Sequence, residues 1–196
     1  MYFDQSELLP ADILVGRNEA PDASKARGIR SVLGSWSNHN ALIVRSAEHG
    51  GYAVGDTTPP RAMVVSLHHY EDLVNAGTYK VRIYRVRDLS MDERLRISLK
   101  WYELSYGRHY SDYTLLQLAL FRFVNHLPFR LPIRGTWCSE NTARPFAAIL
   151  PDDRNPIRKP DPPFLLKKNV TPRTYANRLE CGILEDVTER TNRNDK

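Results

Sequence analysis

Cysteine is scarce in this chain: its 196 residues include two, Cys138 and Cys181. A chain this long with so few cysteines is not a disulfide scaffold, so we expect both thiols to be reduced. Apolar runs are also short, and none approaches the roughly 20 residues that a transmembrane helix needs. Residues 1–6 lack the charged start and apolar centre of a signal peptide. We therefore expect cytoplasmic synthesis without a signal peptide, and no transmembrane segment.

Long basic blocks are absent as well. The formal net charge is +5 and the isoelectric point is near 9.3. This mild excess favours anionic surfaces such as cell-wall polymers, lipid headgroups or nucleic acid, and it selects none of them. No stripe of Lys and Arg with interleaved aromatic residues indicates a specific nucleic-acid partner.

Histidines are few, and they do not follow the spacings that are typical of a zinc site. Apart from His39, discussed below, they are His49, His68, His69, His109 and His126. We therefore expect neither a metal nor another cofactor.

What the chain does contain suits one folded domain with an extension. The composition, 41% hydrophobic and 26% charged, is ordinary for a globular protein. The length argues against two large domains, and we place one domain at residues 1–150. Six of the 13 prolines fall between residues 151 and 172, which excludes a core helix or a central strand there. We expect residues 151–196 to form an extended arm that packs on the domain or projects from it.

Strand and helix patterns are mixed within the domain, which predicts an α+β fold. Strands are expected at residues 12–15, 39–44, 52–56, 63–65 and 79–87. Helices are expected at 67–76, at 91–106 after a capping box, and at 115–124. The second of these helices carries one apolar stripe, made of Leu95, Leu99, Tyr102 and Tyr106. Residues 17–30 are polar and are expected to form a loop that ends in a short helix.

Cys138 occupies the position in the sequence that most favours a nucleophilic side chain. It stands between an extended, proline-rich approach at residues 131–136 and a run that can begin a helix. The first turn of a helix offers unpaired backbone N–H groups and the positive end of the helix dipole. Both favour a thiolate and can receive an oxyanion. A lone cysteine at such a place can equally be a small buried apolar residue.

The best candidate for a base is His39, where a polar segment gives way to the apolar run at 41–44. A histidine there would be the first residue of a buried strand. Asp56 ends the next strand, after a turn at residues 48–51, so a hairpin can set His39 and Asp56 on neighbouring strands. The alternatives are a structural histidine and an aspartate that bonds its own turn.

Three short motifs, in order, resemble the circularly permuted branch of the NlpC-type papain-like superfamily, which includes YiiX-like proteins. They are Ala-Asp-Ile-Leu at 11–14, Ser-Asn-His-Asn-Ala-Leu-Ile at 37–43 and Cys-Ser-Glu at 138–140. The resemblance spans residues 12–149. It implies an antiparallel sheet packed against helices, with the nucleophile at a helix N-terminus. It also implies catalytic roles for Cys138, His39 and Asp56.

This chain departs from the family pattern at several positions. Ala11 replaces a usual glycine, Asn38 stands between serine and histidine, and many relatives have glutamate where Asp56 stands. The resemblance also makes Tyr110 a candidate for binding substrate, and Tyr113 is the alternative. Pro145, seven residues after Cys138, predicts that the helix kinks or stops there.

The resemblance implies a thiol-dependent hydrolase of amide bonds, with bacterial cell-wall peptide as its first candidate substrate. Without a signal peptide, such an enzyme would need delivery by a phage virion, by lysis or by a secretion apparatus. One alternative is a lipid acyl hydrolase or acyltransferase, as in the related lecithin–retinol acyltransferase group. The other is a non-catalytic structural or interaction module, such as a virion component, whose proline-rich arm docks on a partner.

Overall fold

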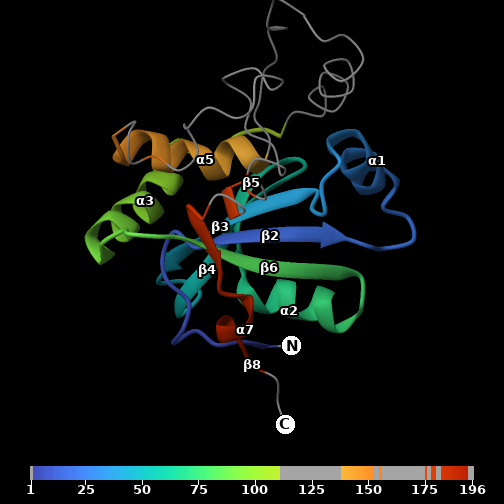
Figure 1. Cartoon of the computed structure of the whole chain (residues 1–196), viewed down its shortest axis with the longest axis horizontal. Helices are drawn as coiled ribbons and strands as arrows, with labels where there is room; N and C mark the ends of the chain where they lie inside the picture. Colours follow the sequence, from blue (N-terminus) through green and yellow to red (C-terminus); the bar gives the residue numbers. More distant parts are fainter. Residues whose placement is uncertain are drawn as a thin grey trace, which may run out of the picture.

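The computed structural model of the chain describes residues 2–110, 138–151, 155, 175, 178–179 and 182–193. The predicted helix at 115–124, Tyr113, Cys181 and most of the proline-rich segment lie outside these residues. The described part has an α+β fold, as the sequence predicts, with helices on both faces of a six-stranded antiparallel sheet (Figure 1).

The central sheet has the strand order β5-β4-β3-β2-β6-β7. Its strands are β2 (Ile13–Asn18), β3 (His39–Ser46), β4 (Gly51–Thr58), β5 (Arg61–Ser66), β6 (Tyr79–Val86) and β7 (Leu184–Asp186). A second, two-stranded sheet pairs β1 (Tyr2–Phe3) with β8 (Asn192–Arg193). All five predicted strands are present, and β2 extends to Asn18, into the segment that we expected to be a loop.

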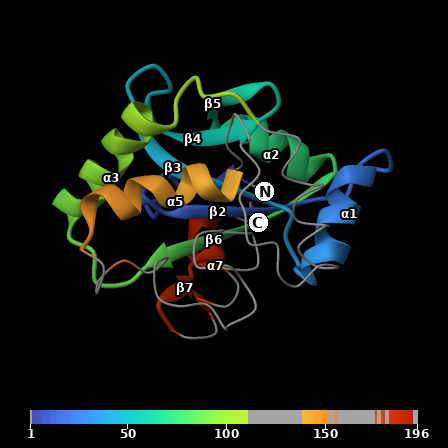
Figure 2. The same cartoon turned by 90° about the horizontal axis from the view of Figure 1, so that it is seen from above.

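The described helices are α1 (Ser24–Leu33), α2 (Leu67–Asn75), α3 (Met91–Leu104), α5 (Cys138–Ile149) and α7 (Thr188–Thr191). Helices α3 and α5 lie on one face of the sheet, and α2 and α7 lie on the other. Helix α1 stands beyond one end of the strands, so that α1 and α3 are at opposite ends of the molecule (Figure 2).

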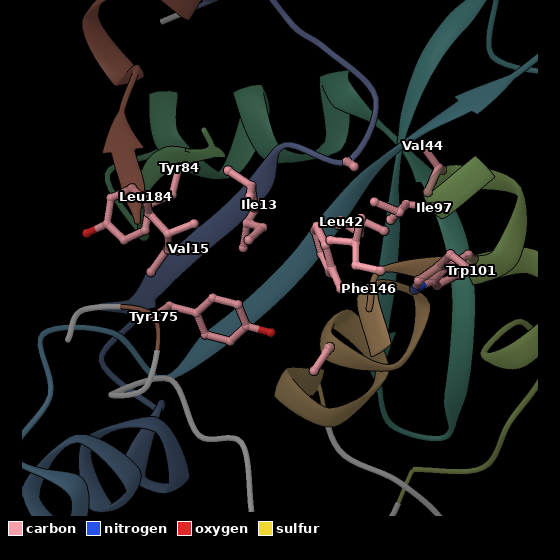
Figure 3. Packing of buried hydrophobic residues seen from close by; sticks show 14 of the residues in the cluster. Ile13, Val15, Leu42, Val44, Tyr84, Ile97, Trp101, Phe146, Tyr175 and Leu184 are labelled. Atoms are coloured by element: carbon pink, nitrogen blue, oxygen red, sulfur yellow. The ribbon is translucent and has the colours of Figure 1, made fainter. Parts of the chain in front are cut away.

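An apolar core fills each side of the sheet. Between the sheet and the helices α3 and α5 lie Ile13, Val15, Leu42, Val44, Ile97, Trp101 and Phe146 (Figure 3). The opposite core contains Ala41, Ile43, Val54, Leu67, Tyr70, Tyr79 and Val81. Successive residues of a strand point to opposite faces. The even-numbered residues of β3 therefore face α5, and its odd-numbered residues face α2.

The apolar stripe predicted on α3 does not lie on the buried face of that helix. The capping box is present as predicted, with the Ser90 side chain and the Glu93 side chain each bonded to the other's backbone N–H. Yet Leu99 is 65% exposed, whereas Trp101 is fully buried. The physical reason is that Arg94 donates to the Val86 carbonyl oxygen at 2.6 Å, which turns the other side of α3 to the sheet.

Helix α5 does not stop at Pro145, contrary to the stronger form of our prediction; it continues to Ile149. A proline has no N–H to donate to the carbonyl four residues earlier, which here belongs to Asn141. The buried Ser105 hydroxyl donates to that Asn141 oxygen at 3.2 Å instead. Helix α3 thus supplies the hydrogen bond that Pro145 removes, and α5 can remain a single helix.

Candidate functional site

The site lies where the pairing between β3 and β4 ends. The ladder between these strands begins at Leu42 and Gly55, so the three residues of β3 before Leu42 are not paired with β4. Strand β4 continues beside β5 instead. The first turn of α5 reaches this place, where the Asn141 side-chain amide donates to the Thr57 hydroxyl at 3.1 Å. The backbone N–H of Asn40 lies close enough to the Cys138 sulfur to lower the pKa of the thiol.

His39 and Asp56 form a buried pair at this end of the sheet. The distance from His39 Nε2 to Asp56 Oδ1 is 2.6 Å, and their side chains are 9% and 5% exposed. The His39 ring also lies close enough to the Cys138 thiol for each group to shift the pKa of the other. Because Nε2 is turned to the carboxylate, Nδ1 is the ring nitrogen left for the sulfur. The structure therefore brings together the three residues that the sequence selected for catalysis.

Two tyrosines that the sequence did not select complete the surroundings of this pair. The Tyr70 hydroxyl, on α2, donates to Asp56 Oδ2 at 2.8 Å, so both carboxylate oxygens have a partner. The Tyr79 ring lies against Gly16, where an added Cβ would be 2.3 Å from the Tyr79 hydroxyl oxygen. Gly16 pairs with His39 across the sheet. The absence of a side chain at Gly16 thus lets Tyr79 pack close to the histidine.

Electrostatics favour a charged imidazole and a thiolate. Burial opposes the charge on His39, but the negative charges that Tyr79, Asp56 and Cys138 can carry raise the pKa of His39 well above its ordinary value. At neutral pH Asp56 is the most important of these, because burial raises the pKa of Tyr79 and leaves its hydroxyl uncharged. Burial would raise its pKa, but the charge and hydrogen bond of His39, together with Tyr70, lower it overall.

The pKa of the Cys138 thiol shifts in the opposite direction to the pKa of the His39 imidazole. Burial would raise the pKa of Cys138, but the positive charge and hydrogen bond of His39 lower it below its ordinary value. The Asn40 N–H and the Ser139 hydroxyl, 3.8 Å from the sulfur, act in the same direction. A thiolate beside an imidazolium is an activated nucleophile with a proton donor at hand.

The first turn of α5 is held rigidly around the cysteine. The Thr142 hydroxyl donates to the Cys138 carbonyl oxygen at 2.9 Å, and the Tyr175 hydroxyl donates to the Ser139 carbonyl oxygen at 3.0 Å. Cys138 is the first residue of the helix, so the N–H groups of this turn have no acceptor within the helix. Such N–H groups can bind the oxyanion that forms when a thiolate attacks a carbonyl.

Tyr110 was the remaining candidate from the sequence. Its backbone N–H donates to the Pro60 carbonyl oxygen, in the turn after β4. Its role in binding substrate stays a prediction.

The residues that sequence reasoning missed carry no distinctive signal. Tyr70 lies in a helix, and Tyr79 begins a strand in which apolar and polar residues alternate, so the sequence indicates two ordinary core residues. Both are indeed buried. Their roles depend on which strand and helix lie beside Asp56 and His39. Their roles could be predicted only by knowing that α2 packs on the face of the sheet that carries Tyr79.

The comparisons with known proteins find a likeness among solved structures. Neither a scan against protein-family models nor a search of curated proteins gives a match. A search of solved structures finds the metalloprotein yiiX from Escherichia coli O157:H7, with a TM-score of 0.51 and 16% sequence identity. The match covers 72% of this chain and 66% of that one, which is slightly less than two thirds of its length. At this identity the likeness shows a shared fold and is consistent with the resemblance to YiiX-like proteins.

Two features of the described residues bear on the possible classes of function. No group of three or more His, Cys, Asp and Glu side chains is placed to hold a metal ion in the part of the chain that the structure describes. In that same part, no helix combines the length and the apolar character needed to cross a membrane.

Proposed function

We propose that the chain is a thiol-dependent hydrolase of amide bonds with a permuted papain-like arrangement of its catalytic groups. The observation that carries the proposal is the buried pair of His39 and Asp56 beside Cys138 at the start of α5. Bacterial cell-wall peptide is the substrate class that the resemblance to NlpC-type proteins implies.

The reaction would proceed through an acyl-enzyme. The Cys138 thiolate, having given its proton to His39, attacks the amide carbonyl carbon, and the carbonyl oxygen becomes an oxyanion. Backbone N–H groups at the start of α5 stabilise that oxyanion. The His39 imidazolium then protonates the leaving amine as the C–N bond breaks. His39 next takes a proton from water, which attacks the thioester and releases the acid.

Asp56 and Tyr70 would position the base. Asp56 holds the His39 ring through Nε2, so that Nδ1 faces the sulfur, and it stabilises the imidazolium. Tyr70 holds Asp56 in turn, through its second carboxylate oxygen. Loss of Asp56 would thus weaken the base without removing the nucleophile.

The test is turnover of purified cell-wall peptides, followed by mass spectrometry of the products and of the protein. We expect new amine and acid termini, and an acyl adduct on Cys138 when the reaction is stopped with acid. Cys138→Ala and His39→Ala should both abolish turnover, and Cys181→Ser is the matched cysteine control that should retain it. Turnover that survives Cys138→Ala would contradict the proposal.

A lipid acyl hydrolase is a second candidate, and a specific observation favours it. Helix α3 exposes Met91, Leu95 and Leu99, with Tyr106 just beyond its end; Met91 is 49% exposed and Leu99 is 65% exposed. An exposed apolar stripe of this kind suits the surface of a lipid aggregate. Co-sedimentation with phospholipid vesicles that Leu95→Ser and Leu99→Ser abolish, together with fatty-acid release, would favour this candidate over the peptide hydrolase.

A further inference from the structure

A group of positive side chains lies near the cysteine, on the same face of the sheet as α5. We call Arg17, Arg27, Arg30, Lys80 and Arg82 the basic cluster. Arg82 pairs with Val15 on β2, and Val15 pairs with Asn40 on β3, so the three form one row across the sheet. Lys80 and Arg17 form the next row toward α1.

Strand alternation decides which face these side chains occupy. Tyr84, Ile13 and Val15 belong to the core that packs against Phe146 of α5. Arg82 and Lys80 have the same parity along β6 as Tyr84, and Arg17 has the same parity along β2 as Val15. The Arg82 guanidinium lies 4.5 Å from the centre of the Trp36 ring, which also packs against this core.

Helix α1 adds Arg27 and Arg30 to the cluster from the end of the sheet. Arg30 Nη1 donates to the Asn18 carbonyl oxygen at 2.7 Å and to Asn38 Oδ1 at 3.2 Å. Asn38 directly precedes His39, so the cluster adjoins the candidate base. Burial lowers the pKa of Arg30, and the charges of Arg17 and Arg27 act in the same direction, while the charge of Glu19 opposes them.

The positive charge of the cluster is only partly balanced. Glu19 contacts Arg17 at 2.7 Å and Lys80 at 2.9 Å. Among the described residues, Arg27, Arg30 and Arg82 form no ion pair, and Asp22, the next acid along the chain, forms none either. The cluster thus carries five positive charges, and Glu19, on which Lys80, Arg17 and Arg30 act, is the carboxylate paired with it. The contacts of Glu19 also show that the cluster accommodates a carboxylate group.

We propose that the basic cluster binds a carboxylate of the peptide substrate, about 10 Å from the carbonyl carbon that Cys138 attacks, two strand spacings away. Arginine and lysine side chains at a partly exposed surface suit this role, because charge-assisted hydrogen bonds from arginine to carboxylates are strong and directional. The inference deepens the proposed function and rests on it. It assigns to this site an acidic peptide as the preferred class of substrate.

The first test compares two thiol reagents that differ by one carboxylate. In a Cys181→Ser background, the alkylation rates of Cys138 by iodoacetate and by iodoacetamide are measured at low ionic strength. The ratio of the two rates cancels any change in the thiolate fraction. We expect a ratio above that of free cysteine, because the His39 imidazolium and the cluster both attract the anionic reagent, and the contribution of the cluster is the part that the double variant below removes. High salt should remove the excess.

The variant Lys80→Gln/Arg82→Gln should lower that ratio about fourfold, since each unit charge at about 10 Å in water changes the rate about twofold. The matched control is Arg96→Gln/Lys100→Gln on α3, at the other end of the molecule, which removes the same charge and should leave the ratio unchanged. A ratio that the first double variant leaves unchanged would overturn the inference, whatever its value relative to free cysteine. A raised ratio at a Cys138 that never turns over peptides would instead count against the proposed function alone.

A second test does not depend on the reactivity of the thiol. Calorimetric titration of Cys138→Ala with acetylated tri-glutamate amide, and with the neutral tri-glutamine peptide, measures recognition directly. We expect binding of the glutamate peptide only, weakened by Lys80→Gln/Arg82→Gln. Equal binding of the two peptides would overturn the inference. Binding of inorganic phosphate in preference to tri-glutamate would overturn the assignment of a carboxylate.

Discussion

At the scale of single residues, Asp56 is the group on which the site depends. One of its oxygens accepts from His39 and the other from Tyr70, and its side chain is 5% exposed. A buried carboxylate stays charged only if such partners compensate its lost hydration. The same charge keeps a buried imidazole protonated. The two groups therefore stabilise each other's charged forms, and the thiolate benefits from both.

Asp56→Asn tests this dependence. Without the carboxylate charge, burial should dominate and the pKa of His39 should fall below its ordinary value of about 6.5. Histidine NMR resonances followed against pH would measure the change. Tyr70→Phe is the matched control, because it removes one hydrogen bond to Asp56 but leaves the charge, so it should shift the pKa of His39 far less. Equal shifts in the two variants would contradict the account.

The pH dependence of stability offers a second check at this scale. The pKa of His39 is raised in the folded state, so its contribution to stability is complete below about pH 6.5 and is lost as the pH rises through the folded pKa. In Cys138→Ala we expect the free energy of unfolding to fall by about 1.4 kcal/mol per pH unit in that interval.

The wild type should show a shallower fall over the same interval. The pKa of Cys138 is lowered on folding, so the thiol releases a proton that offsets part of the proton taken up by His39. Urea unfolding between pH 6 and pH 9 measures both slopes. Equal slopes in the wild type and in Cys138→Ala would show that proton release by Cys138 on folding does not offset proton uptake by His39.

At the scale of elements, the separation of β3 from β4 and the course of α5 create the site. Pairing with β4 starts only at Leu42, which leaves the Asn40 N–H available for the Cys138 sulfur. Helix α5 must also persist beyond Pro145 to pack on β3 and on α3. The Ser105 hydroxyl that replaces the missing backbone hydrogen bond is thus part of the support of the site.

The substitution Ser105→Ala should destabilise the protein by about 1–2 kcal/mol, because it leaves the Asn141 carbonyl oxygen buried without a partner. In a Pro145→Ala background, the backbone N–H that the substitution restores can donate to that oxygen. The same Ser105→Ala change should then cost less. A double-mutant cycle by urea unfolding measures the difference. Additive effects of the two substitutions would mean that Ser105 does not compensate for the proline.

The orientation of α3 can be tested with two neighbouring residues. Ile97 is fully buried, whereas Leu99 is 65% exposed. Ile97→Ala should lower the free energy of unfolding by about 2–4 kcal/mol, and Leu99→Ala by less than about 0.5 kcal/mol. Chemical denaturation of both variants provides the measurement. A larger loss of stability in Leu99→Ala than in Ile97→Ala would mean that the stripe of Leu95 and Leu99 faces the core, as the sequence pattern predicted.

At the scale of the whole molecule, the sequence predicts the strands and their α+β arrangement because local periodicity dominates there. Alternation in β6 and the capping box of α3 are local signals, and both are found in the structure. The buried face of α3 was misjudged because Arg94, a charged residue, is held inside by Asp12 and the Val86 carbonyl oxygen. Long-range contacts of this kind leave no trace in the periodicity of a single helix.

The candidate site was found through the order of its motifs, and the structure brings His39, Asp56 and Cys138 together. Ala11, where the resemblance implies glycine, has a φ of 66°, in the left-handed region that glycine favours. The basic cluster could not be predicted, since its members come from β2, α1 and β6. Only the register of the sheet places Arg17, Lys80 and Arg82 together.

The most direct test of the account is the alkylation rate of Cys138 by iodoacetamide as a function of pH, in a Cys181→Ser background. A thiol paired with the His39 imidazolium should react well below the usual thiol pKa of about 8.5, and His39→Ala should move its inflection back toward that value. An inflection near 8.5 in both proteins would contradict the nucleophile–base pair and favour a non-catalytic role for this fold.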